Sequence, residues 1–361
     1  MNSIDAKLQA AHDFLTILVE AVFLYTAGSD LLIRNRKNTM TQNTICLLGG
    51  TGFVGRHLLS LLSKQGHHIL VLSRHPQRHR DLKVLPGVEL IHANVHDIIS
   101  LRQHFTNADA VINLVGILNE RHDNGKGFHH VHVELTRNIL HACHDRGVRR
   151  LLHMSALNAD PAASSYYLRS KGEAEQLVLQ AKGLDVTCFR PSVIFGPGDR
   201  FINRFARILK ITPLFFPLAC GYARLAPVYV GDVAQAFADS LDMQASFGQS
   251  YDLCGPHRYT LQEIVEYVNQ ILELKRIINP LGNVLSRLQA NLLEHIPGKP
   301  FSKDNFRSLQ TDSICPKASH DLQIHFGINP SSMKSIVPGY LLHQKQKHRY
   351  DHLRQQLTRC E

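Results

Sequence analysis

Apolar and polar residues alternate along this chain in two different patterns. Short continuous apolar runs are typical of strands buried on both faces of a parallel sheet, and stretches with an apolar residue every three or four positions are typical of helices. After two strands within 44–74, the pattern predicts strands at 88–93, 110–115, 148–154 and 185–190. The predicted fold is α/β, a doubly wound Rossmann parallel sheet with a small, mostly helical C-terminal lobe.

The helices and the lobe boundaries follow from the same pattern. Helices are predicted at 127–143, 166–178, 201–211, 259–274 and 280–295. Asp97, Asp232 and Thr260 are expected to cap helices, because their side-chain oxygens can accept from the first amides of a helix. Residues 211–226, rich in proline and apolar side chains, either line an apolar pocket or pack between lobes. The expected parts are an N-terminal extension at 1–39, a Rossmann domain at 40–255 and a substrate or docking lobe at 256–361.

A glycine motif follows the first predicted strand. Gly49, Gly52 and Gly55 stand at three-residue spacing and lead into an apolar helical stripe. The first glycine allows a sharp turn, the second allows backbone amides to approach a pyrophosphate, and the third lets the helix pack on the sheet. The helix then begins near Phe53 and Val54, with unpaired N–H groups facing the phosphates. This pattern predicts a dinucleotide site, and a glycine turn without a ligand is the alternative.

The end of the second strand is basic. A site selective for NAD(H) usually carries Asp or Glu here, whereas this chain has Arg74, with Arg78 and Arg80 close behind. A guanidinium group at this place can pair with a 2′-phosphate. The sequence therefore favours NADP(H), with NAD(H) still open and a solvated basic loop as the alternative.

Two further strand ends extend the predicted cofactor site. Asn94 and Val95 follow the third strand, where an adenine ring would lie. Val115 and Gly116 end the fourth strand, and the glycine permits a close approach of the backbone to a cofactor. Ligands of open α/β sheets bind at these carboxyl ends, so we expect the four residues to line one site.

A candidate catalytic set follows the fifth strand. Ser155 ends that strand, and Tyr167 and Lys171 lie four residues apart on one face of the next predicted helix. An ammonium group beside a phenol stabilises the phenolate and lowers its pKa, which suits proton transfer. Ser155 would hold a substrate oxygen while Tyr167 donates or accepts the proton, and a purely structural role is the alternative.

Histidines and cysteines suggest no metal site. His129 and His132 share one helical face, but no carboxylate or cysteine completes a set of ligands at recognisable spacing. The seven cysteines are scattered and include no CxxC pair, so we expect free thiols in a reducing compartment.

Charge limits the range of partners. The chain of 361 residues has a formal net charge of +10, which suits phosphorylated cofactors, acidic membrane surfaces or nucleic acid. Nucleic acid is disfavoured because no helix-turn-helix, zinc-finger or RNA-binding signature is present. No apolar run is long enough to span a bilayer.

Both ends of the chain differ from the Rossmann pattern. Residues 1–39 precede the first strand, and either Met40 is the true start or the segment is an amphipathic docking helix. The tail from Tyr340 onward is basic, which predicts a solvated helix or, alternatively, docking on an anionic membrane or an acidic protein.

Taken with their context, these motifs resemble the extended short-chain dehydrogenase/reductase superfamily. They most resemble its atypical branch, which contains the 39-kDa NAD(P)H-binding subunit of respiratory complex I and its bacterial relatives. The matching segments are 49–55, Ser155, Tyr167 with Lys171, 190–201, 227–237 and 292–312. The resemblance implies that the three glycines hold a pyrophosphate, that Arg74 holds the 2′-phosphate, that Lys171 binds the nicotinamide ribose, and that Arg190 and Pro191 adjoin the cofactor. Sugar-nucleotide epimerases and dehydratases usually carry Asn where this chain has Val193.

Three functions are consistent with the sequence. The first is an NADPH-dependent oxidoreductase acting on a hydrophobic carbonyl or alcohol. The second is a non-catalytic, NADPH-holding accessory or assembly subunit of a respiratory NADH–quinone oxidoreductase, and the third, disfavoured by Val193, is a sugar-nucleotide epimerase or dehydratase. We expect a cytoplasmic protein, either free or attached to the inner face of the membrane.

Overall fold

The computed structural model describes residues 42–316 and 321–342. Every described helix and strand belongs to one compact unit, Asn43–Glu361. The predictions for residues 1–39, Met40 and the basic tail beyond residue 342 lie outside the described residues. Within the described residues, none of the helices has the length and apolarity needed to cross a bilayer.

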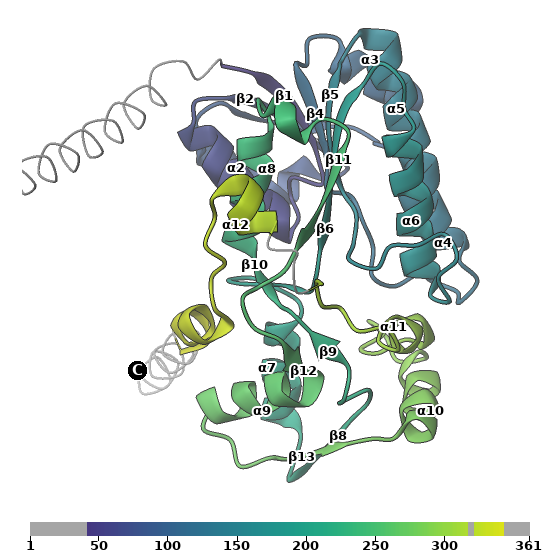
Figure 1. Ribbon diagram of the computed structural model, residues 1–361, viewed down its shortest axis with the longest axis vertical. Helices are drawn as coiled ribbons and strands as arrows, with labels where there is room; N and C mark the ends of the chain where they lie inside the picture. Colours follow the sequence, from purple (N-terminus) through teal and green to yellow (C-terminus); the bar gives the residue numbers. More distant parts are fainter. Residues whose placement is uncertain (1–41, 317–320, 343–361) are drawn as a thin grey trace, which may run out of the picture. The chain divides into compact units, whose positions relative to one another are not determined.

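A seven-stranded parallel sheet forms the centre of this unit (Figure 1), which confirms the predicted Rossmann fold. Its order is β11-β6-β5-β4-β1-β2-β3, and all six neighbouring pairs are parallel. The strands are β1 (Thr44–Leu48), β2 (His68–Ser73), β3 (Val88–His92), β4 (Ala110–Asn113), β5 (Arg150–Met154), β6 (Asp185–Pro191) and β11 (Gln249–Leu253).

Helices cover both faces of this sheet (Figure 1). One face carries α2 (Phe53–Lys64) and α8 (Val230–Ser240), and the other carries α3 (Ile98–Phe105), α5 (Leu135–Arg146) and α6 (Tyr166–Leu179). A hydrophobic core lies on each face of the sheet, and strand β1 contributes side chains to both because its successive side chains point to opposite faces. Ile45 and Leu47 join the cluster under α2 and α8, whereas Cys46 and Leu48 join the cluster under α3 and α5. Further helical segments are η1 (Pro76–Val84), α4 (Lys126–Phe128), the π-helix η2 (His129–Glu134) and η3 (Gln244–Ser246).

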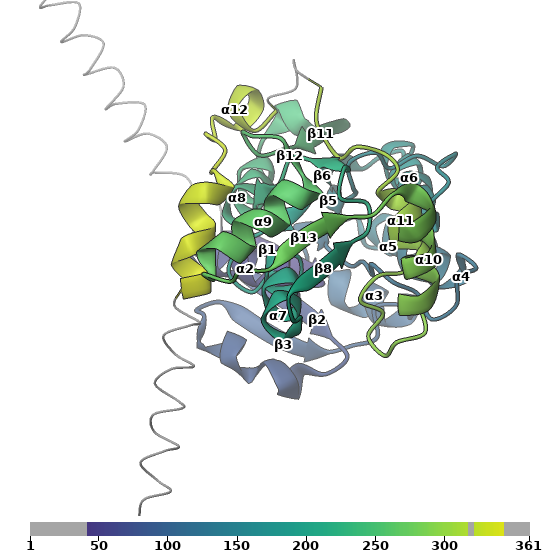
Figure 2. The same cartoon turned by 90° about the horizontal axis from the view of Figure 1, so that it is seen from below.

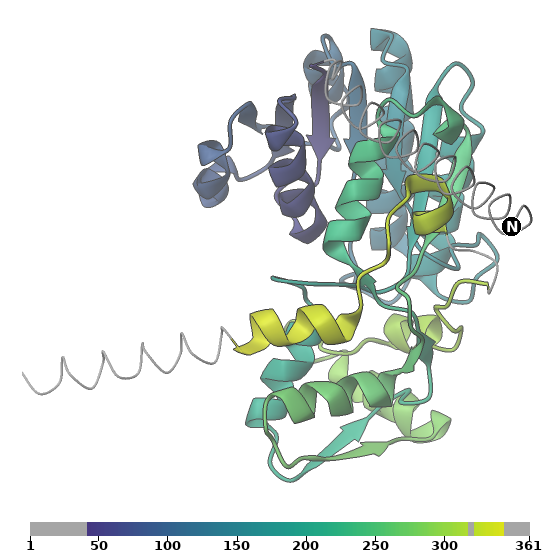
Figure 3. The ribbon, with the colours of Figure 1, turned by 60° about the vertical axis from the view of Figure 1, so that its left-hand side comes forward.

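A second lobe lies at the carboxyl ends of the strands (Figures 1 and 3). Its core draws on three stretches of sequence, and the cluster includes Phe195, Leu209 and Phe216 from the first, Ile264 from the second and Val337 from the third. Phe216 and Leu218 are buried in it, so part of the segment 211–226 packs as lobe core. The elements are β7 (Ile194–Phe195), α7 (Ile202–Ile211), β8 (Phe215–Leu218), β9 (Arg224–Leu225), β10 (Val228–Tyr229), β12 (Tyr259–Thr260), α9 (Leu261–Ile271), β13 (Ile277–Pro280), α10 (Asn283–Leu293), α11 (Lys303–Ser308), α12 (Asp321–Phe326) and a helix over 333–342.

Two of the three predicted helix caps are confirmed. Asp97 accepts from the amide of Ile99, and Thr260 forms a capping box with Glu263 at the start of α9. The prediction for Asp232 is wrong, because α8 begins earlier, at Val230, and its N-cap is Tyr229. Asp232 lies within the first turn and accepts instead from the amide and hydroxyl groups of Ser331, at 2.7 and 3.1 Å.

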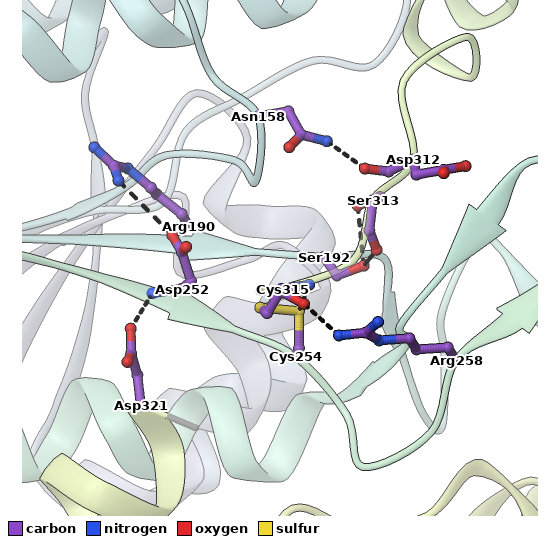
Figure 4. Close-up of a disulfide and its surroundings, with 10 residues drawn as sticks. All are labelled: Asn158, Arg190, Ser192, Asp252, Cys254, Arg258, Asp312, Ser313, Cys315 and Asp321. Carbon is purple, nitrogen blue, oxygen red and sulfur yellow. Dashed lines mark hydrogen bonds and ion pairs between the residues drawn. A yellow bond between two sulfur atoms is a disulfide. The ribbon is translucent and has the colours of Figure 1, made fainter. Parts of the chain in front are cut away.

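The expectation that all cysteines are free thiols is wrong for two of them. Cys254, just after β11, forms a disulfide with Cys315 across 61 residues of sequence (Figure 4). The two approach because the segment around Ser313 crosses the strand ends, where its carbonyl accepts from the hydroxyl of Ser192 at 2.8 Å. Cys46, Cys143, Cys188 and Cys220 are free and buried, and Cys360 lies outside the described residues.

Candidate functional site

The glycine turn after β1 has the backbone conformation that its sequence predicts. Gly49 has a φ of +81°, a region that favours glycine, and the amide of Gly52 donates to the carbonyl of Gly49 at 3.0 Å. A Cβ atom at Gly55 would stand 2.5 Å from that same carbonyl oxygen. Only glycine therefore allows the first turn of α2 to pack this closely on the end of β1.

The N-terminus of α2 is open to an anion. Its N-cap is Gly52, no described side chain caps it, and no acidic residue stands in its first turn. The amides at Phe53 and Val54 therefore belong to a helix end that favours negative charge. Gly52 is exposed, and a Cβ atom there would meet only the carbonyl of Gly49 within 4 Å. This arrangement fits a pyrophosphate group.

The basic loop after β2 lies next to the end of β3. Arg74 is exposed and forms no ion pair with a described residue. Burial, followed by the charges of His130 and Arg74, lowers the pKa of His96, so Arg74 lies near the segment that carries Asn94 and Val95. Asn94 is exposed and accepts from the amide of His96 at 3.2 Å, and Val95 is buried.

The turn after β4 places a predicted cofactor residue, Gly116, beside a predicted catalytic residue, Lys171. The amide of Val115 donates to the side chain of Asn113 at 3.1 Å, which shapes the turn. A Cβ atom at Gly116 would lie 3.4 Å from Nζ of Lys171 and 3.5 Å from Nε2 of His132. Lys171 is therefore next to a predicted cofactor residue, as the sequence suggests.

Ser155 belongs to a buried polar network that the sequence did not reveal. Its hydroxyl donates to Oε2 of Glu175 at 2.5 Å, and both residues are almost fully buried. Arg190 donates to the other oxygen of Glu175 at 2.6 Å and also faces Asp252 at 3.7 Å. Pro191 is buried at the end of β6. Both Ser155 and Arg190 thus use their polar groups within the protein.

Tyr167 and Lys171 share a face of α6, but their pKa values differ from the expected pattern. The ammonium group of Lys171 donates to the carbonyl of Met154 at 2.8 Å, and burial lowers its pKa to about 8. Burial, together with the carboxylate of Asp304, raises the pKa of Tyr167 to about 12. The expected lowering of the phenol pKa is therefore absent, because burial and a nearby negative charge both favour the neutral phenol.

Asp304, from α11, caps the helix of Tyr167. It is 3% exposed, and its carboxylate accepts from the amides of Tyr166 and Tyr167 at 2.7 and 3.1 Å. The hydroxyl of Ser165 donates to it as well, at 2.9 Å. Arg307 holds this carboxylate from the other side and also pairs with Asp123. Asp304 lies in the segment 292–312, which matched the resembled family in sequence, but its role as a helix cap is seen only in the fold.

His132 is buried and hydrogen-bonded within the protein. Its Nε2 accepts from the amide of Ile117 at 3.1 Å, and its Nδ1 lies 2.8 Å from the hydroxyl of Ser170. His129 instead faces Glu134 at 3.4 Å. Across the described ranges, no three His, Cys, Asp or Glu residues are grouped so that they could hold a metal ion.

Comparison with known proteins agrees with the glycine turn and the sheet. The model of the NAD dependent epimerase/dehydratase family matches residues 45–254, and the chain belongs to this family. A Mus musculus relative, NADH dehydrogenase [ubiquinone] 1 alpha subcomplex subunit 9, mitochondrial, is 30% identical over 80% of this chain and 78% of its own. The ceramide reductase of Caulobacter vibrioides is 28% identical over 54% of this chain and 60% of its own.

A solved structure supports the same fold. The dTDP-glucose 4,6-dehydratase DesIV of Streptomyces venezuelae, with NAD and TYD bound, superposes with a TM-score of 0.66. It is 17% identical and covers 85% of this chain and 98% of its own. At this identity the likeness concerns the fold alone.

Proposed function

We propose that this chain is an NADPH-holding accessory subunit of a respiratory NADH–quinone oxidoreductase. The observation that carries the proposal is the state of the predicted catalytic set. The hydroxyl of Ser155 donates to buried Glu175, so its hydrogen is already used within the protein, which suits a site that retains a cofactor without turning over substrate. The similarity to the mouse subunit over most of both chains supports the same assignment.

The cofactor proposed for this site is NADP(H). The turn at Gly49, Gly52 and Gly55 and the N-terminus of α2 would hold its pyrophosphate, and Arg74 its 2′-phosphate. Gly116 and Lys171 would adjoin its nicotinamide end. When bound, the nicotinamide can donate or accept hydride, which is chemistry that a holding subunit need not use.

An unpartnered apolar surface supports docking on a larger assembly. On α10, Val284, Leu285, Leu288 and Leu292 are 82, 54, 52 and 64% exposed. They lie within an arc of about 100° of that helix, opposite its buried Ser286 and Ala290. Exposed Phe215 and Ile277 are paired across β8 and β13, at the same end of the lobe (Figures 1 and 2).

Basic residues outnumber acidic ones in the segments that carry this surface, which suits an acidic partner. The segments 202–218 and 274–296, which carry it, contain six basic residues and one acidic residue. The acidic one, Glu294, already pairs with Lys299 at 3.1 Å. We therefore propose that the apolar surface of α10, called the α10 surface below, binds an acidic protein surface of the membrane-bound complex.

Gentle cell fractionation tests this assignment. The wild-type chain is expected with the membrane complex, carrying NADPH that mass spectrometry can identify after denaturation. Replacing Leu288 and Leu292 by Glu should release it, whereas Glu at the equally exposed Ile99 and Ile324 should not. A purely free pool of wild type, with no retained cofactor, contradicts the proposal. Binding to protein-free anionic vesicles would instead assign the α10 surface to lipid.

A second function has specific support. Lys171 and Tyr167 are four residues apart in α6, Lys171 lies next to Gly116, and the ceramide reductase is similar over about half of the chain. An NADPH-dependent reductase acting on a lipophilic carbonyl is therefore the second candidate. Turnover of NADPH with such carbonyls that is abolished by Tyr167→Phe would support it. A sugar-nucleotide reaction ranks third, because Val193 packs partly buried against the lobe core.

A further inference from the structure

His132 links the turn after β4 to the helix of Tyr167 and Lys171 through hydrogen bonds that all run in one direction. The amide of Ile117 can only donate, so Nε2 of His132 is the acceptor at 3.1 Å. Nδ1 must then carry the proton and donate to the hydroxyl of Ser170 at 2.8 Å. The hydroxyl of Ser170 in turn donates a hydrogen bond to the carbonyl of Tyr167 at 2.9 Å. Every group in this chain of bonds is therefore satisfied.

The charge state of the ring suits this arrangement. His132 is 2% exposed, and burial, followed by the charges of Lys171 and His153, lowers its pKa well below the ordinary value. The imidazole therefore stays neutral near pH 7. A neutral ring can accept at one nitrogen and donate at the other, whereas a protonated ring would lose the bond from Ile117.

The backbone around His132 is unusual and holds the ring firmly. His132 lies inside the π-helix His129–Glu134, and such single wide turns often occur at functional sites. Its ring stacks on Phe128 at 5.8 Å and meets the ring of Tyr167 edge-on at 5.7 Å. Its carbonyl accepts from the hydroxyl of Thr136 at 2.6 Å. The wide turn thus places one side chain between two elements of the candidate site.

We infer that His132 is a positioning residue of the cofactor site, fixing the turn at Gly116 and Ile117 relative to the helix of Tyr167 and Lys171. A Cβ atom at Gly116 would stand 3.5 Å from Nε2 of His132, so the ring adjoins the part of the site assigned to the nicotinamide end. This inference rests on the proposed cofactor binding. It predicts that His132 matters for the nicotinamide half of NADPH and not for the adenosine half.

Two ligands separate this role from a general effect on folding. NADPH spans the whole site, whereas 2′,5′-ADP carries only the adenosine half and the 2′-phosphate. Titration of the full-length chain should show that His132→Leu weakens NADPH binding at least tenfold, since two hydrogen bonds are lost, and changes the affinity for 2′,5′-ADP less than about twofold. His129→Leu, in the same π-helix but half-exposed, should change neither affinity.

Conservative variants test the two hydrogen bonds separately. The amide oxygen of Gln reaches the place of Nε2 and can keep the bond from Ile117, whereas the amide nitrogen of Asn reaches the place of Nδ1 and can keep the bond to Ser170. Both variants should bind NADPH with affinities between those of wild type and His132→Leu. If the leucine variant does not fold, these two carry the comparison.

Three outcomes overturn the inference. The same NADPH affinity in wild type and in all His132 variants would exclude a positioning role. Equal losses for NADPH and 2′,5′-ADP would show a structural effect on the whole domain. A wild-type chain that binds neither ligand refutes the proposed cofactor function itself, and the inference with it.

Discussion

At the scale of single residues, buried charge decides what the candidate site can do. Lys171 is 4% exposed and its ammonium group is held by one carbonyl, so its charged form is costly in the folded state. Arg74, by contrast, is exposed and unpaired by any described carboxylate, which leaves its charge free for a ligand. We therefore expect the first residue to affect stability and the second to affect selectivity.

The pH dependence of stability tests the burial of Lys171. Its pKa falls from 10.5 to about 8 on folding, so the cost of burying the ammonium group is fully present below pH 8 and is lost above about pH 10.5. Lys171→Met removes this cost. The unfolding free energy of the variant minus that of wild type should therefore decrease by about 3 kcal/mol between pH 7.5 and 10.5. Urea denaturation at several pH values measures it, and a constant difference contradicts the assigned pKa.

Measuring cofactor selectivity tests the proposed contact between Arg74 and the 2′-phosphate. Arg74→Asp places a carboxylate where the 2′-phosphate is proposed to bind, so affinity for NADPH should fall at least tenfold while affinity for NADH is kept or improved. Fluorescence titration with both cofactors measures the change. Lys83→Asp, the same change of charge at another exposed residue, in η1, is the matched control. Equal losses in both variants would indicate an effect of net charge alone.

At the scale of elements, the site depends on how α6 is held between two parts of the fold. The strands, the glycine turn and α6 could be predicted, because hydrophobic period and glycine spacing are local properties of the sequence. The partners of α6 could not. His132 meets Ser170 across 38 residues, and Asp304 meets Tyr166 across 138. Such contacts follow from chain topology, which no local pattern of residues encodes.

Removal of the cap tests the contribution of α11 to α6. Asp304→Ala leaves the amides of Tyr166 and Tyr167 without their buried acceptor, so the free energy of unfolding should fall by about 2 to 4 kcal/mol. Asp97→Ala, which removes an exposed cap with one hydrogen bond from α3, should cost only about 1 kcal/mol. Urea denaturation compares the two. Similar losses would mean that α11 contributes no more than an ordinary surface cap.

At the scale of the whole described molecule, one covalent bond joins the lobe to the sheet. The disulfide between Cys254 and Cys315 (Figure 4) joins residues at a sequence separation of 61, and the segment between them includes α9, α10 and α11. The sequence did not predict this pairing, because an odd number of scattered cysteines gives no partner assignment. The pairing follows from the return of the segment around Ser313 to the strand ends, where it is bonded to Ser192.

The stability of the lobe should therefore depend on redox conditions. Closing a loop of this length restricts the unfolded chain, so replacing both cysteines by Ser should lower the unfolding free energy by about 4 kcal/mol under oxidising conditions. In excess dithiothreitol the wild type should lose most of that advantage. Replacing the free Cys220 by Ser is the control, and it should give a loss that is independent of reductant. If wild type is equally stable with and without reductant, the bond contributes nothing to holding α11 and its Asp304 over the candidate site.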